Sequence, residues 1–171
     1  MPPTPSLTEA VQLHQQGHVE QAQQIYLSVL QSDPNHFDAK HLLGVTYLQT
    51  AQYPLALENI QAALQINPNS AAAHSNLGRV QHETKLYEEA LKSYDQAIAL
   101  KKDFAEAHYN KGNALRELKR MAEASEAYQQ AIAYKSDYAA AYQNLGVVAH
   151  ELRDYETAVA YYDKTIAIQS T

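Results

Sequence analysis

The chain has 171 residues, of which 46% are hydrophobic, so it can bury a core in one compact domain or a short array. Its net charge of −6 and the absence of a basic cluster argue against nucleic acid as the main partner, because phosphate binding needs clustered Lys and Arg side chains. The sequence has no cysteine, no signal-peptide pattern and no apolar run near the roughly 20 residues that cross a bilayer, so we expect a cytoplasmic protein that does not enter a membrane.

The first elements along the chain are a short arm and a helix. Residues 1–6 are expected to form the N-terminal arm, and residues 7–171 a single domain. Ser6 and Glu9 make an S-x-x-E capping box, in which the serine and the acidic side chain satisfy free N–H groups at the helix start. The first helix is therefore predicted to begin near Leu7.

Further signals place the helices that follow. Gly17 supplies the turn after the first helix, and Pro54 falls in the first turn of a later helix, where proline is tolerated. In the middle of the chain, Asn69-Ser70 caps the segment AAAHSNLGRVQHE. The next segment, TKLYEEALKSYDQAIAL, has apolar residues three and four apart, which is the spacing of a helix that buries one face. The sequence thus predicts a pair of helices here.

The sequence repeats itself at an interval of 34 residues. The segments SNLGRV, YNKGNA and QNLGVV begin at Ser75, Tyr109 and Gln143. Aligned small and large residues extend this period over the chain, and such a period predicts stacked helical units. The predicted repeats span about residues 3–36, 37–70, 71–104, 105–138 and 139–171, and positions are counted from these starts.

Small residues are aligned at two repeat positions. Position 8 holds Ala10, Gly44, Gly78, Gly112 and Gly146, and position 20 holds Ala22, Ala56, Ala90, Ala124 and Ala158. A glycine inside a helix costs about 1 kcal/mol against alanine, so an aligned set indicates that two helices approach closely there. We expect Gly78 to lie close to Ala90, and the large residues at positions 24 and 28 to fill the space between repeats.

These residues resemble the tetratricopeptide repeat family over nearly the whole chain. The family pattern is matched by Leu77, Gly78, Tyr87, Ala90, Tyr94 and Ala97, and again by Leu145, Gly146, Tyr155, Ala158 and Tyr162. Departures are Ala10 for glycine, Lys111 for leucine and Met121 for an aromatic residue. The resemblance implies an all-α, right-handed α-solenoid of five tandem helix-turn-helix repeats. The first helix of each repeat, helix A, is expected to line its concave side.

An asparagine stands at position 6 of the last three repeats, at Asn76, Asn110 and Asn144. Positions 2, 5, 6, 9, 12 and 13 share the exposed face of helix A. Because a carboxamide both donates and accepts, such a row could hold an extended peptide by its backbone. The row resembles the repeat region of protein O-GlcNAc transferases, which implies a substrate-recruiting role within a larger glycosyltransferase. The alternative is that these side chains are only solvated.

Charged and polar residues flank this row. The predicted peptide-binding set adds Arg79, Asn113, His82, Arg116 and His150 to the three asparagines. The Arg and His side chains of this set could attract carboxylates, more so below pH about 6.5, where histidine is charged. An acidic row at position 13 lies beside them. The alternative is that Arg116 pairs with a neighbouring glutamate at the surface, where such pairs contribute little.

The leading interpretation is an interaction scaffold that binds an extended peptide or protein segment in a concave groove. No nucleophile, base and orienting group are placed to meet, so this segment is not expected to be an enzyme, although a catalytic domain could follow it. The sequence predicts neither a cofactor nor a metal site.

Two alternatives remain open. A co-chaperone clamp for acidic C-termini is matched by Asn113 and Asn144, but Tyr109 stands where its lysine is expected. A self-assembly module is favoured by the last helix, where Tyr162, Ile166 and Ile168 lack an evident cover. We expect that the chain is part of a longer protein or that this face pairs two-fold with another copy.

Overall fold

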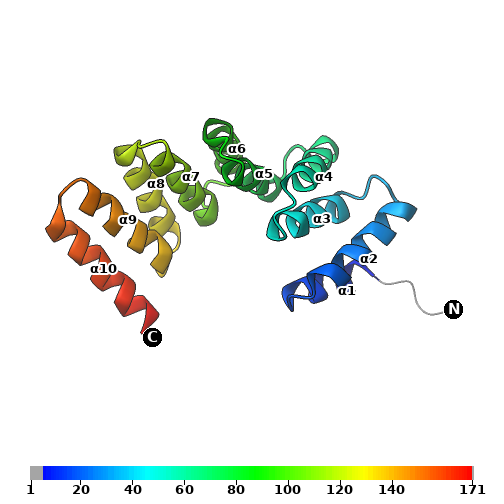
Figure 1. Cartoon of the computed structure of the whole chain (residues 1–171), viewed down its shortest axis with the longest axis horizontal. Helices are drawn as coiled ribbons and strands as arrows, with labels where there is room; N and C mark the ends of the chain where they lie inside the picture. The colour runs from blue at the N-terminus through cyan, green and yellow to red at the C-terminus, as the bar shows by residue number, and fades with distance from the viewer. Residues whose placement is uncertain (1–5, 171) are drawn as a thin grey trace. The chain divides into compact units, whose positions relative to one another are not determined.

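The computed structural model describes residues 6–170, and this part of the chain contains ten helices and no strand (Figure 1). The predicted all-α fold is therefore confirmed. The first five helices are α1 (Leu7–Gln15), α2 (Val19–Ser32), α3 (Phe37–Gln49), α4 (Tyr53–Ile66) and α5 (Ala71–Glu83). The other five are α6 (Tyr87–Leu100), α7 (Ala105–Glu117), α8 (Met121–Tyr134), α9 (Ala139–Glu151) and α10 (Tyr155–Gln169). Most of the predicted arm, residues 1–5, lies outside the described residues.

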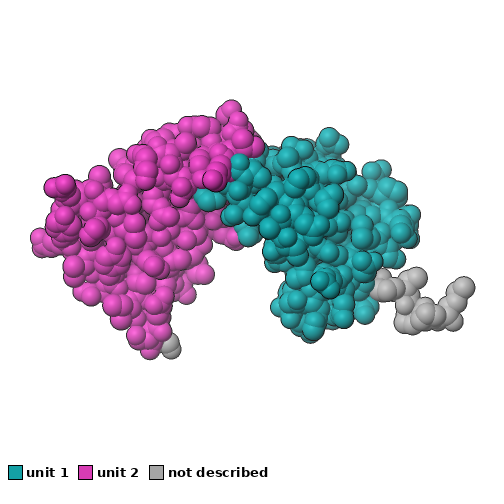
Figure 2. Space-filling model, in the orientation of Figure 1, with its two compact units in different colours: residues 1–84 teal, residues 85–171 magenta. Residues whose placement is uncertain are grey.

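The chain divides into two compact units, residues 1–84 and 85–171, coloured separately in Figure 2. Unit 1 carries α1–α5 and unit 2 carries α6–α10. The boundary falls in the turn between the two helices of the third predicted repeat. Gly78 and Ala90 belong to different units, so their predicted proximity stays a prediction, as does the single domain over residues 7–171.

Several helices begin where a side chain caps them. The Ser6 hydroxyl accepts a hydrogen bond from the backbone N–H of Glu9 at 3.2 Å, which confirms the predicted start of α1 at Leu7. The Ser70 hydroxyl accepts from the N–H of Ala73 at 3.2 Å at the start of α5. Each bond satisfies one of the N–H groups that a helix leaves free at its start.

The turn between the two helices of each repeat uses one left-handed residue, at position 15. Gly17 has φ of 83°, as the sequence suggested. The equivalent residues of the other repeats are Ala51, Lys85, Lys119 and Arg153, with φ between 56° and 64°. A residue with a Cβ is strained in this conformation, so the connection between the helices imposes it.

The position 8 glycines make room for the residue at position 24. A Cβ on Gly112 would stand 2.5 Å from Cε1 of the Tyr128 ring, and one on Gly44 would stand 2.6 Å from Cγ1 of Ile60. The position 20 alanine also comes near, as expected, because the carbonyl oxygen of Ala56 would stand 3.2 Å from a Cβ on Gly44.

The core of each unit joins the two helices within a repeat and also joins the second helix of one repeat to the first helix of the next. Tyr26 of α2 packs with Leu43 of α3 in unit 1, and Tyr128 of α8 packs with Leu145 of α9 in unit 2. The position 24 side chains Tyr26, Tyr94 and Tyr128 are fully buried. This packing fixes where helix A residues of consecutive repeats meet, and that seam contains the candidate site.

Candidate functional site

Asn144 is the centre of a hydrogen-bonded cluster between α7 and α9. Its Nδ2 donates to Oδ1 of Asn113 at 2.8 Å and to the Tyr109 hydroxyl at 3.3 Å. Its Oδ1 accepts from Nη1 of Arg116 at 3.4 Å. We call Tyr109, Asn113, Arg116, Tyr128 and Asn144 the amide cluster. Both functional groups of the Asn144 carboxamide are therefore engaged within unit 2.

Tyr128 is the member of the amide cluster that comes from α8. Its hydroxyl donates to Oδ1 of Asn113 at 2.8 Å, and its ring lies 5.8 Å from that of Tyr109. Burial raises the pKa of Tyr128, so its hydroxyl keeps its proton and acts as a donor at all ordinary pH values. On its other side, Tyr109 contacts the ring of Tyr138 at 4.9 Å. The rings of Tyr109, Tyr128 and Tyr138 thus pack together beside the two amides.

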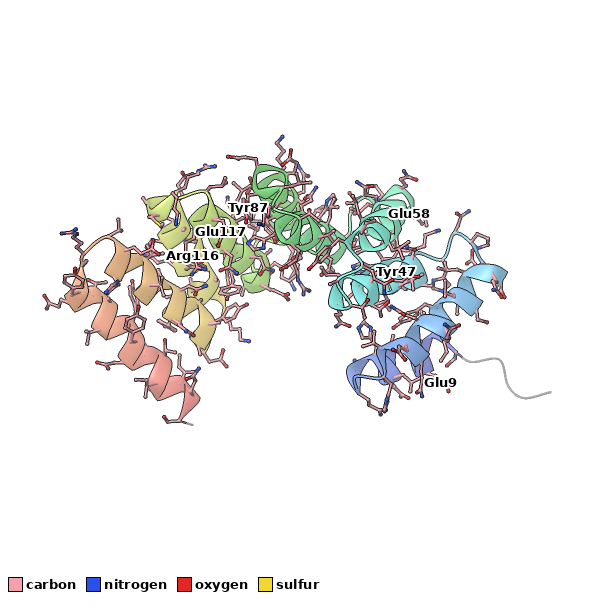
Figure 3. The ribbon with its side chains drawn as sticks, viewed as in Figure 1. Glu9, Tyr47, Glu58, Tyr87, Arg116 and Glu117 are labelled. Carbon is pink, nitrogen blue, oxygen red and sulfur yellow. The ribbon has the colours of Figure 1, made fainter. Side chains whose placement is uncertain are left out.

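The amide cluster presents donors rather than acceptors. Oδ1 of Asn113 already accepts two hydrogen bonds, and Oδ1 of Asn144 accepts from Arg116. Arg116 forms no ion pair with a carboxylate in residues 6–170, so the alternative that it pairs with a neighbouring glutamate is wrong. Arg116 and Glu117 are adjacent in the last turn of α7 (Figure 3). A guanidinium offers five N–H donors, so Arg116 keeps capacity for a carboxylate or carbonyl ligand.

A similar arrangement occurs in unit 1, between α3 and α5. Nδ2 of Asn76 lies 2.9 Å from Nε2 of His41, and Nη1 of Arg79 donates to Oδ1 of Asn76 at 3.2 Å. His41 is only 8% exposed and stacks on Phe37, with ring centroids 5.7 Å apart. Arg79 also lacks a carboxylate partner within the described residues. Each unit thus contains an asparagine bonded to the preceding helix A and to an arginine.

The predicted asparagine row is therefore not a row of free carboxamides. Asn76 and Asn144 spend their donors and acceptors on internal hydrogen bonds. Asn110 differs, because its Nδ2 is buried and has no hydrogen-bond partner in the described part of the chain. A buried N–H without a partner costs about 1–3 kcal/mol, so Asn110 is the asparagine of the row whose amide donor is left unsatisfied within the described residues.

The remaining predicted residues make other contacts. Nδ1 of His82 is 3.8 Å from the Glu83 carboxylate at the end of α5. His150 is exposed and packs edge-on against Tyr155, at 5.3 Å. Of the predicted self-assembly residues, Ile166 is 62% exposed, whereas Ile168 is half-buried.

Tyr162 is not as exposed as we expected. It is half-buried, and its ring lies against Gly146, so that a Cβ there would collide with the ring. The exposed apolar side of α10 is instead formed by Tyr155, Val159 and Ile166, which are 57%, 58% and 62% exposed. Their spacing of four and seven residues places them on one face of the helix.

Sequence reasoning missed the partners of the asparagines. His41 and Tyr109 both occupy repeat position 5, and each stands 35 residues before the asparagine it contacts. Position 5 of one helix A therefore faces position 6 of the next. Polar or aromatic residues at position 5, compared with the following position 6, were the signal that could have found them.

Family models match most of the chain. A tetratricopeptide repeat model matches residues 86–118 and 112–152, and a second one matches residues 139–171. A model for the anaphase-promoting complex subunit 3 matches residues 15–97. The two tetratricopeptide models together cover residues 86–171, and the second one matches the span of the last predicted repeat. The chain belongs to the tetratricopeptide repeat family. No curated protein sequence matches it.

Solved structures share the fold. A crystal structure of MamA is 26% identical over 94% of this chain and 94% of its own, with a TM-score of 0.82. The Pseudomonas aeruginosa protein PilF is 24% identical over 94% of this chain and 73% of its own, with a TM-score of 0.87. YrrB is described as a tetratricopeptide protein with an unusual peptide-binding site. It is 24% identical over 96% of this chain and 84% of its own, with a TM-score of 0.74.

Tetratricopeptide arrays are protein-interaction scaffolds that use the extended surface of their stacked helices. Within residues 6–170, no three His, Asp or Glu side chains gather as metal ligands. In the same residues, no helix has the length and apolar character needed to cross a bilayer.

Proposed function

We propose that this tetratricopeptide array binds an extended, acidic peptide segment along its helix A face. The observation that carries the proposal is the amide cluster, where Arg116 faces an amide oxygen and has no carboxylate partner in the described residues. Arg116 has no carboxylate partner within residues 6–170, and the amide oxygens around it already accept hydrogen bonds. A ligand that supplies its own acceptors is therefore favoured. Arg79 repeats this arrangement in unit 1. The peptide-binding site named for YrrB supports a peptide as the class of ligand.

Magnitudes indicate that binding to a single cluster is weak. A net hydrogen bond contributes about 1 kcal/mol, and one to a charged group about 1.5–3 kcal/mol. One cluster with an arginine and two further donors therefore reaches about 4 kcal/mol, which is a millimolar dissociation constant. A physiological ligand would engage several repeats or be tethered nearby, which raises its effective concentration.

The test uses two capped octapeptides, alternating Ala-Glu and alternating Ala-Gln, in NMR titrations of the full chain. The acidic peptide should shift the Arg116 and Asn113 side-chain signals and bind at least several-fold more tightly. Arg116→Gln should remove most of that preference. Arg120→Gln is the matched control, because Arg120 already pairs with Glu88 and Glu123. Equal affinity for both peptides, or an unchanged preference in Arg116→Gln, would contradict the proposal.

The asparagine row supports a form of this proposal in which the site recognises the peptide backbone. Asn110 carries this form, because its buried Nδ2 lacks a partner in the described residues. Asn110→Ala should then weaken both octapeptides by about 1 kcal/mol, or about fivefold. Unchanged affinity would make Asn110 a residue of the packing alone. A role in recruiting substrates for a protein glycosyltransferase rests on the positions of Asn76, Asn110 and Asn144 and on no contact beyond them.

The co-chaperone clamp needs charged side chains that bind carboxylates, and the amide cluster differs from it at two points. Asn113 and Asn144 hydrogen bond to each other, and Tyr109 stands in place of the lysine. A peptide with a free, acidic C-terminus should therefore bind no better than the capped acidic octapeptide. A clear preference for the free C-terminus would favour the clamp.

Self-assembly is the second candidate, favoured by the exposed Tyr155, Val159 and Ile166 on one face of α10. The outward residues of α1 are polar, with Glu9 and Gln12 exposed, so a head-to-tail contact is disfavoured and a two-fold α10 contact is the simpler arrangement. Ile166→Lys should abolish concentration-dependent association in sedimentation velocity. Leu27→Lys, at another exposed apolar residue, should leave it unchanged. A wild-type chain that stays monomeric at high concentration would exclude this candidate.

A further inference from the structure

His41, Asn76 and Arg79 form a chain of hydrogen bonds whose directions are fixed by chemistry. The Arg79 guanidinium has only donors, so the Asn76 atom that faces it, 3.2 Å from Nη1, must be Oδ1. The other end of the amide, Nδ2, then faces Nε2 of His41 at 2.9 Å. Nδ2 also carries only donors, so Nε2 of His41 must be the acceptor. The imidazole is therefore neutral, with its proton on Nδ1.

A proton on Nε2 of His41 is incompatible with this arrangement. Two donors, the Nε2–H of His41 and the Nδ2–H of Asn76, would then face each other in a buried place. The conflict is removed if the Asn76 carboxamide turns over, so that Oδ1 accepts from the imidazolium. Nδ2 then faces Arg79, which has lost its acceptor. Both the Asn76 amide nitrogen and the Arg79 guanidinium are left as donors without an internal partner.

We propose that protonation of His41 turns the Asn76 carboxamide and frees Arg79, so that the unit 1 site takes an acidic peptide more strongly as the pH falls. This inference rests on the proposed function in that Arg79 is one of the ligand-contacting residues. Two donors and a new positive charge then face a ligand rich in acceptors. By linkage, the bound acidic segment holds the proton on His41 more firmly.

The surroundings of His41 set where the change occurs. Burial lowers the pKa of His41 below 6.5, and the Asp38 carboxylate on the same helix partly opposes this. From α5, the group that faces His41 is Asn76, with the positive Arg79 behind it. The ring stacks on the uncharged Phe37. The pKa of His41 is therefore lowered, and the transition is expected on the acidic side of an ordinary histidine.

The first experiment needs no ligand. Long-range proton–nitrogen NMR spectra of the full chain report the tautomer and the pKa of His41, and side-chain amide spectra follow Asn76. At pH 7.5, His41 should carry its proton on Nδ1. The Asn76 amide and Arg79 guanidinium signals should shift with the same midpoint as His41. An Nε2-protonated tautomer at pH 7.5, or Asn76 signals that ignore the titration of His41, would overturn the proposal.

The second experiment measures affinity for the capped Ala-Glu octapeptide at pH 7.5 and 5.5. Wild type should bind several-fold more tightly at pH 5.5, whereas His41→Gln, which keeps a buried amide acceptor without a titrating group, should lose that gain. His74→Gln is the matched control and should keep it. If His41→Gln keeps the full gain, the inference is wrong. If the peptide binds at neither pH while the NMR signals still move together, the proposed function fails and the proton-driven turn of Asn76 stands.

Discussion

At the scale of single residues, the repeat positions are not equivalent in how tightly they are held. Gly112 and Gly146 both stand under a tyrosine ring at position 24. Tyr128 is fully buried and its hydroxyl is bonded to Asn113, whereas Tyr162 is half-buried on the last helix. The same glycine therefore meets a fully buried, hydrogen-bonded ring in one repeat and a half-buried ring in the other.

This difference predicts unequal effects of one substitution. Gly112→Ala should lower the free energy of unfolding by about 1–3 kcal/mol, because the added Cβ collides with a fully buried ring. Gly146→Ala should cost less or be neutral, since Tyr162 can swing outward and alanine favours the helix by about 1 kcal/mol. Urea unfolding of both variants measures the difference. A larger loss for Gly146→Ala would contradict this account.

The left-handed turn residues allow a second comparison. Gly17 has φ of 83°, and a Cβ there would meet nothing within 4 Å, so Gly17→Ala isolates the cost of the backbone conformation. We expect a loss of about 1 kcal/mol. Lys119→Gly should stabilise by about 0.5–1 kcal/mol, because φ of 61° strains a lysine and suits a glycine. Thermal unfolding tests both, and a stabilising Gly17→Ala would show that the turn strain is negligible.

At the scale of elements, side-chain caps distinguish helices that are otherwise alike. α5 begins at a serine whose hydroxyl accepts from the N–H of Ala73, whereas α7 and α9 follow Phe104 and Tyr138, which make no such bond. The start of α5 also precedes Asn76 and Arg79 by only a few residues. Its cap therefore holds the first turn that presents the unit 1 site.

Removing this cap should be measurable. Ser70→Ala should destabilise the chain by about 1 kcal/mol, because the N–H of Ala73 loses its partner. Ser70→Asn keeps an oxygen acceptor and should restore most of the stability. Urea unfolding and the exchange rates of the first α5 amides provide the readout. Equal stability of all three chains would mean that water replaces the cap without cost.

At the scale of the whole molecule, the two compact units should respond to damage separately. In a repeat array each helix contacts mainly its neighbours, so a local loss of packing spreads a short way along the chain. Within unit 1 one core cluster joins α1, α2 and α3, and within unit 2 a core cluster joins α6, α7, α8 and α9. Stability is therefore a property of neighbouring helices more than of the full length.

Hydrogen exchange of Gly112→Ala tests this expectation. Amides of α7, α8 and α9 should exchange faster than in wild type, because the packing of Tyr128 is disturbed. Amides of α1, α2 and α3 should keep their wild-type rates. Gly44→Ala, where the Cβ would meet Ile60, serves as the reciprocal variant and should affect unit 1. Equal acceleration in both units for either variant would show that the chain opens as one cooperative body.

Much of the architecture could be predicted from local patterns. The 34-residue interval, the capping box at Ser6 and the turn at Gly17 are set by residues close in sequence, so they predicted helices and their limits. The left-handed Lys85 and Lys119 escaped prediction, because lysine carries no local sign of that conformation. It is imposed by the tight connection between two packed helices.

The candidate site could likewise be predicted only in part from local sequence patterns. Asn76, Asn110 and Asn144 could be found by period alone, but whether their amides are free depends on residues 35 positions earlier that stacking brings within hydrogen-bond distance. The sequence by itself determined a helical repeat with an asparagine at one position. Only the tertiary structure decided that Asn144 is saturated by Asn113 and Arg116 while Asn110 is not, because a buried polar group takes whichever partner the packing brings nearest.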